Sequence, residues 1–339
     1  MPTSLAMPEQ VASPGFERIL ITGAGGFVGS RLIKVLAGEW SKAELVFASR
    51  GDARSPSPFP EVNFDLADPA SVRKAVHQVR PDLVVHLAAQ SSVAKGEGAA
   101  AETWNVNLAG SLALADAVSK LDDATVFFAS SSEVYGEAFN GGEVTEATPP
   151  QPKSIYAQSK LAAEMVFASV LRDDQRLIVA RPCNHSGAGQ ATTFVLPSFA
   201  MQILSGAPQI EVGNLAAERD FVHVDDVVDA YVALLKASSS FSPRTTFNIA
   251  SGQPKSIQSL LSRMIELSGR SVEVVLDPSR LRASDVPRTA LSAQRIGAQT
   301  DWSIKRSVDQ ILQDLLEPGD HDASVNLAGG LPAQSSGAI

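Results

Sequence analysis

A glycine-rich turn directly after a short apolar run is the feature that most constrains this chain. Residues 19–29 have the sequence ILITGAGGFVG, in which Gly23, Gly26 and Gly29 follow a predicted buried strand. Glycines at this spacing let a strand turn tightly into a helix and let the backbone approach a pyrophosphate closely. The start of that helix offers unpaired N–H groups and a partial positive charge to an anion. The turn therefore predicts a dinucleotide site, in which Phe27 and Val28 also contact the cofactor.

Apolar runs of strand length alternate with longer amphipathic segments through the first half of the chain. This alternation predicts repeated βαβ units and a parallel sheet with helices on both faces. The expected fold class is α/β, with a Rossmann-type doubly wound parallel sheet. The predicted strands are residues 18–22, 44–48, 62–64, 83–87, 125–130 and 177–181, and the predicted helices are residues 26–37, 69–79, 100–120 and 154–171.

The pattern changes after residue 181 to loops with Gly and Pro, mixed with helices expected at 194–204 and 256–267. A smaller C-terminal substrate lobe is often built in this way. Residues 224–235 and 246–250 are expected to return to the first domain, so the lobe is discontinuous. The predicted units are a disordered tail at 1–16, a dinucleotide-binding domain at 17–183 plus 220–250, a substrate lobe at 184–219 plus 251–317, and a disordered tail at 318–339.

Charge and composition exclude several classes of function. A chain of 339 residues with 44% apolar residues can bury a sizeable core. Its net charge of −9 argues against a nucleic acid or an anionic membrane as partner. The single cysteine, Cys183, rules out an internal disulfide, and the first residues lack the pattern of a secretory signal, so a cytoplasmic location is expected. The five histidines show no metal-ligand spacing, so no metal site is expected.

Three polar residues in the middle of the chain predict proton transfer. Ser131 ends a predicted strand, and Tyr156 and Lys160 lie one turn apart on one face of a predicted helix. Tyrosine has a pKa of about 10, so its phenolate needs the positive charge of Lys160 and of an oxidised nicotinamide. In the reducing direction, Tyr156 would donate a proton to a carbonyl oxygen as hydride reaches the carbon. Ser131 would hydrogen-bond the same oxygen. These residues predict a nicotinamide-dependent oxidoreductase.

The residue after the second predicted strand indicates which nicotinamide cofactor is used. Arg50 stands where an NAD-specific protein usually has a carboxylate for the ribose hydroxyls. A guanidinium there favours a 2′-phosphate through a charge-assisted contact. NADP(H) is therefore the preferred cofactor, while Asp52 keeps NAD(H) open.

Two further strand ends are expected to line the cofactor. The third strand ends where the adenine of a dinucleotide would lie. The fourth ends in small side chains that leave room for the dinucleotide. The residues concerned are Asp65, Leu66, Leu87, Ala88 and Ala89.

From residue 18 to residue 316 the chain resembles the extended short-chain dehydrogenase/reductase family of nucleotide-sugar epimerases, dehydratases and reductases. The resemblance implies a nicotinamide cofactor, a nucleotide-diphosphate-sugar substrate and a homodimer joined through the helices around 100–120 and 154–171. The matching motifs are TGAGGFVG at 22–29, SSEVYG at 131–136, YAQSK at 156–160, RPCN at 181–184 and RDFVHVDD at 219–226.

Two stretches resemble the GDP-4-dehydro-6-deoxy-D-mannose reductases within that family, namely RPCNHSGAGQ at 181–190 and LRASDVP at 281–287. This resemblance implies NAD(P)H-dependent reduction of the C4 ketone of GDP-4-dehydro-6-deoxy-D-mannose to GDP-D-rhamnose. Glu133, Asn184, Arg219 and Arg282 match substrate-binding positions of the family. A sugar diphosphate is an anion, so an acidic protein needs such guanidinium groups locally. Cys183 departs from the usual bulky residue and leaves the substrate fit open.

Alternative functions stay open on the same motifs. GDP-mannose 4,6-dehydratases share the tyrosine and lysine and use a glutamate at the position of Glu133 as an acid/base. Against a dehydratase, Phe27 and Val28 replace its usual Gln-Asp pair, and residues 186–190 lack its arginine. Another nucleotide-sugar 4-epimerase or reductase is a further alternative. A non-enzymatic NADP-binding sensor is the alternative of a different class, and the intact proton-transfer residues argue against it.

Overall fold

The computed structural model describes residues 14–50, 58–91, 98–281 and 286–317. The predicted C-terminal tail, most of the predicted N-terminal tail, Asp52 and Arg282 lie outside the described residues. Residues 14–16 are described, and there the Trp40 indole N–H donates to Pro14 O at 2.9 Å.

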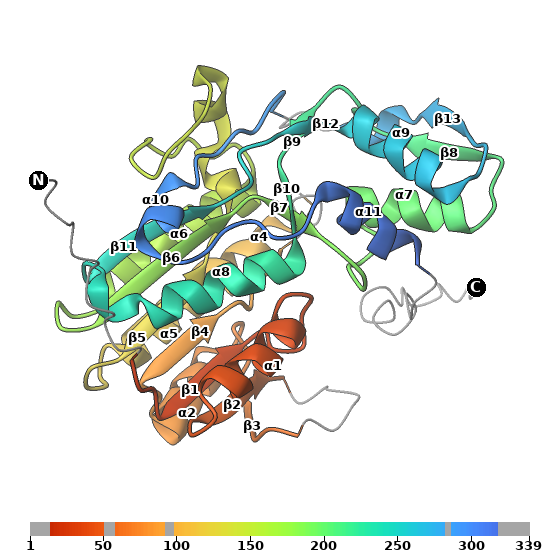
Figure 1. Ribbon diagram of the computed structural model, residues 1–339. Helices are drawn as coiled ribbons and strands as arrows, with labels where there is room; N and C mark the ends of the chain where they lie inside the picture. The colour runs from red at the N-terminus through yellow and green to blue at the C-terminus, as the bar shows by residue number, and fades with distance from the viewer. Residues whose placement is uncertain (1–13, 51–57, 92–97, 282–285, 318–339) are drawn as a thin grey trace, which may run out of the picture.

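A seven-stranded, wholly parallel sheet forms the centre of the protein, in the order β11-β6-β5-β4-β1-β2-β3 (Figure 1). The chain moves outward from β1 in one direction and then from β4 in the other, which confirms the predicted doubly wound sheet. A crevice for a ligand arises at the carboxyl ends of the strands where the order reverses. The strands are β1 Arg18–Thr22, β2 Glu44–Ser49, β3 Glu61–Asn63, β4 Leu83–His86, β5 Thr125–Ala129, β6 Arg176–Pro182 and β11 Arg244–Ile249.

Helices cover both faces of the sheet because its strands are apolar on both sides. Along β1, Ile19 and Ile21 belong to one core and Leu20 to the other, since successive side chains of a strand point to opposite faces. The first core includes α1 and α8, and the second includes α2, α5 and α6. Their bounds are α1 Gly29–Glu39, α2 Pro69–Val79, α5 Gly110–Val118, α6 Ile155–Val170 and α8 Val224–Lys236.

The helix predicted at 100–120 differs from the structure, where it forms three pieces. These are α4 Ala100–Trp104, the π-helical turn η1 Asn105–Ala109, and α5. The wider turn carries Asn107, a buried amide whose Oδ1 accepts from Gln90 N at 2.8 Å. Its Nδ2 donates to Gln90 O and to Ser159 Oγ, both at 3.0 Å. Turns of this kind often occur at functional sites, and Ser159 directly precedes Lys160.

A smaller, third core lies beyond the carboxyl end of β6, and Figure 1 shows its elements gathered to one side of the sheet. Two short strand pairs connect it to the sheet: β7 with β10 in parallel and β9 with β12 antiparallel. The elements of this core are α7 Val195–Leu204, β8 Gln209–Val212, α9 Ile257–Ser268, β13 Glu273–Leu276 and α11 Val308–Leu316. The connecting strands are β7 Asn184–Ser186, β9 Glu218–Arg219, β10 Phe221–His223 and β12 Lys255–Ser256.

The remaining elements are short. They are the 3-10 segments η2 Ser132–Gly141, η3 Ser238–Ser240 and η4 Pro278–Arg280, and the helix α10 Gln294–Gln299. Leu291, Ile296 and Trp302 pack into the core with α1 and α8 rather than into the third core. The predicted division into two domains stays a prediction. Within the described residues, no helix is long and apolar enough to cross a membrane.

Candidate active site

The glycine turn is shaped by contacts with the end of β4. Gly23 has a φ of +73°, and a Cβ placed on it would lie 2.8 Å from Ala88 N. A Cβ on Gly29 would lie only 2.2 Å from Gly23 O, so the protein itself requires glycine at both positions. A Cβ on Gly25, by contrast, would meet nothing within 4 Å. The outer side of the turn is therefore open to a ligand.

The start of α1 is suited to an anion. Val28 is the N-cap residue and makes no side-chain capping bond, and the first turn contains no acidic residue. The first backbone N–H groups of a helix have no partner within the helix, so an anion can accept from them. A turn that only glycine can form, next to an uncapped helix start without acidic residues, fits the pyrophosphate of a dinucleotide.

The predicted cofactor residues lie at one edge of the sheet, as parallel strands require. Arg50 is exposed directly after β2, and Asp65 and Leu66 follow β3. Leu66 packs closely enough on α5 that a Cβ on Gly110 would lie 2.7 Å from it. After β4, Ala88 N donates to the Thr22 hydroxyl at 3.2 Å and thereby ties the strand end to the turn. Leu87 and Ala89 lie on either side of this bond.

Ser131 and Tyr156 are brought together, as the sequence predicted. Ser131 follows β5, is 9% exposed, and accepts at its hydroxyl from Glu133 N at 3.2 Å. A hydrogen-bonding interaction with the Ser131 side chain lowers the pKa of Tyr156, and the charge of Glu133 raises it. Ser154 caps α6 by accepting from Ala157 N at 3.1 Å, which fixes where the helix with Tyr156 begins.

The stabilisation of the Tyr156 phenolate by Lys160 and an oxidised nicotinamide stays a prediction, and the protein's own groups raise the pKa of Tyr156. Burial raises the pKa of Tyr156 to about 12, and the Ser131 bond opposes this only in part. Water stabilises a phenolate better than the protein interior does, so the neutral phenol is favoured. Tyr156 is therefore protonated at neutral pH, which is the form that donates a proton to a ketone.

Lys160 lies deeper than Tyr156, at 3% exposure. Its Nζ lies 4.4 Å from the centre of the Phe128 ring on β5. Burial lowers the pKa of Lys160 to about 7, while the charge of Glu164 acts in the opposite direction. Lys160 is thus only partly charged near neutral pH, which limits how far it can stabilise a phenolate.

The predicted substrate residues lie where the third core joins the sheet. Asn184 begins β7 and pairs in register with Phe221 of β10. Arg219 is half-buried on β9, two residues before Phe221, and its Nη1 donates to Glu218 O at 2.8 Å. Arg282, the second predicted arginine, lies outside the described residues.

The sequence did not predict a contact of the glycine turn and the start of α1 with β7 and the loop that follows it. The rings of Phe27 and His185 are stacked, with centres 6.2 Å apart and planes 5° from parallel. The Arg31 guanidinium lies 4.7 Å from the centre of the Phe27 ring and pairs with Asp225 at 3.3 Å. Its Nη2 donates to Ala188 O at 2.5 Å. Phe27, an aromatic residue inside the glycine motif, was the sequence feature that could have predicted this contact.

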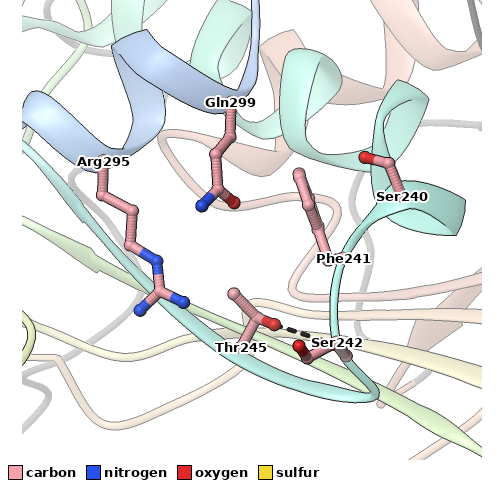
Figure 2. Close-up of a pocket in the computed structure, with 6 residues that line it drawn as sticks. All are labelled: Ser240, Phe241, Ser242, Thr245, Arg295 and Gln299. Atoms are coloured by element: carbon pink, nitrogen blue, oxygen red, sulfur yellow. Dashed lines mark hydrogen bonds between the residues drawn. The ribbon is translucent and has the colours of Figure 1, made fainter.

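A cavity of about 230 Å³ lies at the opposite end of the sheet and is distinct from this site (Figure 2). It is lined by residues around the start of β11, including Thr245, together with Arg295 and Gln299 of α10. The hydroxyls of Ser240 and Thr245 already donate to backbone carbonyls, at 2.7 and 2.8 Å. The amino ends of the strands carry none of the proton-transfer residues, so the catalytic groups and not this cavity define the candidate active site.

Comparisons with known proteins identify the family of the chain. Residues 19–250 match the model of the NAD dependent epimerase/dehydratase family. A GDP-6-deoxy-D-mannose reductase of Pseudomonas aeruginosa is 33% identical over 88% of this chain and 97% of its own length. A GDP-6-deoxy-D-talose 4-dehydrogenase of Aggregatibacter actinomycetemcomitans is 29% identical over 80% of this chain and 87% of its own length.

Solved structures with nicotinamide cofactors have the same fold. RMD from Pseudomonas aeruginosa, complexed with NADPH, superposes with a TM-score of 0.72 at 30% identity, over 88% of this chain and 97% of that one. The UDP-glucose 4-epimerase of Thermus thermophilus, in complex with NAD, gives a TM-score of 0.79 at 28% identity, over 90% of this chain and 98% of that one.

Proposed function

The chain belongs to the NAD-dependent epimerase/dehydratase family, and we propose that it reduces the C4 ketone of GDP-4-dehydro-6-deoxy-D-mannose to GDP-D-rhamnose with NAD(P)H. The observation that carries the proposal is the interaction of the Ser131 side chain with the Tyr156 phenol, which lowers the phenol's pKa, at the strand edge where the glycine turn opens. The similarity to GDP-sugar enzymes with a reductase or dehydrogenase activity supports the substrate class.

The mechanism follows from the protonation states of the site residues. When bound, the reduced nicotinamide supplies the hydride. Tyr156, protonated because burial raises its pKa to about 12, donates its proton to the C4 oxygen. Ser131 hydrogen-bonds the same oxygen and holds it beside the phenol. The positive charge of Lys160 stabilises the phenolate that remains after the proton has left.

Binding of the sugar diphosphate is proposed for the residues that join the third core to the sheet. Asn184 and Arg219 lie on strands that lead into that core, and Arg219 is half-buried. A half-buried guanidinium meets less competition from water for a phosphate than an exposed one does. Glu133, whose charge acts on Tyr156, is proposed to contact the sugar. Arg282 stays a prediction from the sequence.

NADPH is the proposed cofactor, with NADH as the alternative. Arg50 lies exposed at the carboxyl end of β2, beside the predicted position of the adenosine ribose. A structural relative was solved with NADPH and another with NAD, which supports both possibilities within this fold.

A GDP-mannose 4,6-dehydratase is the second candidate. Its specific support is Glu133, a carboxylate close enough to act on Tyr156 and of the type that moves a proton at a sugar carbon. Such an enzyme returns the hydride to the same sugar, so it shows no net consumption of cofactor.

Two parallel incubations separate these candidates. Purified protein with both NADPH and NADP⁺ receives either GDP-4-dehydro-6-deoxy-D-mannose or GDP-mannose, because the ketone needs a hydride donor and GDP-mannose needs a hydride acceptor. Absorbance at the NADPH band and the sugar products are followed. Consumption of NADPH only with the ketone supports the reductase. Conversion of GDP-mannose without loss of NADPH supports the dehydratase. Tight NADPH binding with no conversion of any sugar nucleotide would favour the sensor and contradict the proposed reaction.

A homodimer through α5 and α6 is also proposed. Leu112 on α5 and Met165 on α6 are 46% and 65% exposed, and the two helices contact each other. Covering both in a dimer removes this apolar surface from water. The cytoplasmic location stays a prediction, to be tested by fractionating cells that express the protein.

A further inference from the structure

A buried carboxylate lies behind the candidate proton-transfer residues. Glu164 stands on α6, one helical turn after Lys160. Its Oε1 accepts from the Ser130 hydroxyl and from Arg181 Nε at 3.0 Å, and its Oε2 accepts from Arg181 Nη2 at 2.5 Å. The side chains of Glu164 and Arg181 are each 8% exposed. A charge that is paired and hydrogen-bonded in this way can stay ionised at such depth.

These bonds connect the elements that carry the site. Ser130 follows β5 and directly precedes Ser131, while Arg181 lies on β6. Glu164 lies on the same helix as Tyr156 and therefore holds the end of β5 against α6. The relative position of the Ser131 and Tyr156 hydroxyls depends on this connection.

Stability alone is a weak reason for this ion pair. Apolar side chains of similar volume often stabilise a core as well as a buried ion pair does, because the two charges lose their water. Arg181 is held further by Tyr135, whose ring centre lies 4.9 Å from the guanidinium and whose hydroxyl donates to Asn248 Oδ1 at 2.7 Å. The network is thus fully bonded and leads from β11 to the helix with the candidate catalytic residues.

We propose that Glu164 is a positioning residue of the ketone reduction, acting through Lys160 and Ser131, with Arg181 holding its carboxylate in place. This inference rests on the proposed function and adds a residue to it. Glu164 does not touch the reacting atoms. It fixes the strand end that carries Ser131, and its negative charge favours the protonated form of the Lys160 amine.

The groups that face Lys160 agree with this role. Among the described residues that act on its amine, Glu164 favours the charged form, against the effect of burial. His86 on β4 also faces Lys160, but burial lowers the pKa of His86 to about 3, so it is neutral near pH 7. Phe128 presents only a ring face to Nζ. Without the Glu164 charge, the lowering of the Lys160 pKa by burial would lose the carboxylate that opposes it.

A lysine titration tests this role without any cofactor or substrate. The pKa of Lys160 is measured from its ¹³Cε resonance in lysine-labelled protein, identified by its loss in Lys160→Met. Glu164→Gln is expected to lower that pKa by about one unit. The matched control is Glu39→Gln, which removes a carboxylate from an exposed ion pair with Lys236, and it should change nothing. An unchanged Lys160 pKa in Glu164→Gln overturns the proposal.

Kinetics give the second measurement. If the reduction occurs, kcat at pH 7 should fall about tenfold in Glu164→Gln, with an unchanged KM and an alkaline limb displaced to lower pH. A merely structural residue would lower activity equally at every pH. The lysine titration gives a result even if the wild type reduces no ketone, so failure of the proposed function is distinguishable from failure of this inference.

A double variant covers the case in which Glu164→Gln does not fold because Arg181 is left unpaired. Glu164→Met with Arg181→Met removes both charges and keeps the volume apolar. A wild-type unfolding midpoint together with a lowered Lys160 pKa and a reduced kcat supports the positioning role. A wild-type Lys160 pKa or a wild-type kcat in this variant overturns it. Ser130→Ala keeps the charge pair, and it should lower kcat while leaving the Lys160 pKa unchanged.

Discussion

The side chain of Ser131, after the end of β5, interacts with the phenol of Tyr156, in the first turn of α6, and lowers its pKa against the effect of burial. The two residues are far apart in the sequence and come together because β5 and α6 meet at the carboxyl edge of the sheet. This pair is the proposed proton-transfer centre, and its function depends on the groups that surround it.

Tyr156→Phe should abolish most of the reduction while leaving cofactor binding intact. The substitution removes the proton donor but keeps the ring, so we expect kcat to fall by roughly 10²–10⁴-fold. The NADPH affinity, measured by fluorescence titration, should stay within twofold. Tyr231→Phe removes a hydroxyl from another buried tyrosine and should retain turnover. Retained turnover in Tyr156→Phe would remove this tyrosine from the mechanism.

Arg50→Ala should weaken NADPH binding without changing NADH binding. Loss of a charge-assisted contact to the 2′-phosphate is expected to raise the Kd for NADPH by about 10- to 100-fold. The control is Arg73→Ala, which removes a different exposed arginine, one that lies on α2. Equal changes in the affinities for NADPH and NADH would argue against a role in cofactor choice.

Gly29→Ala should disrupt the glycine turn. The new methyl group would lie 2.2 Å from Gly23 O, so the turn must move before the helix can pack. We expect a lower thermal midpoint and loss of NADPH binding. Gly38→Ala is the matched control on α1, because a Cβ there meets nothing within 4 Å, and it should be neutral or slightly stabilising. A Gly29→Ala variant with normal NADPH binding would contradict the described turn.

His86 should make the protein sensitive to acid. Its folded pKa is lowered to about 3 from an ordinary value of 6.5, so the unfolded chain binds its proton first as the pH falls. Stability should therefore decrease between pH 6.5 and pH 3, by up to about 1.4 kcal/mol for each pH unit. In His86→Gln, the thermal unfolding midpoint should decrease less steeply with pH across this window than in the wild type. An equal slope in both proteins would exclude His86 as the source.

Substitution of the exposed apolar residues on α5 and α6 should produce a monomer. We expect Leu112→Asp combined with Met165→Asp to introduce charge repulsion across the proposed interface. Light scattering coupled to size exclusion measures the mass. Leu276→Asp, at a 58% exposed leucine on β13, is the control and should leave the assembly unchanged. A monomeric wild type would refute the proposed dimer directly.

Strand positions were predictable because parallel strands are short, apolar on both faces and separated by helices. Each of the six predicted strands ends within one residue of its observed limits. The π-helical turn at Asn107 was missed, since its cause is a set of hydrogen bonds to Gln90 and Ser159, which lie elsewhere in the sequence. The buried Glu164 was missed for the same reason, because its partners Ser130 and Arg181 come from two other elements.

The sequence by itself determined the doubly wound sheet and the glycine turn, and it predicted that Ser131, Tyr156 and Lys160 share one site. Local patterns suffice for these features, since strand alternation and a strand–turn–helix motif act over a few residues. Only the tertiary structure decided the protonation states. Tyr156 and Lys160 have a raised and a lowered pKa respectively because of how deeply they are covered, and that depth depends on the elements that pack over them.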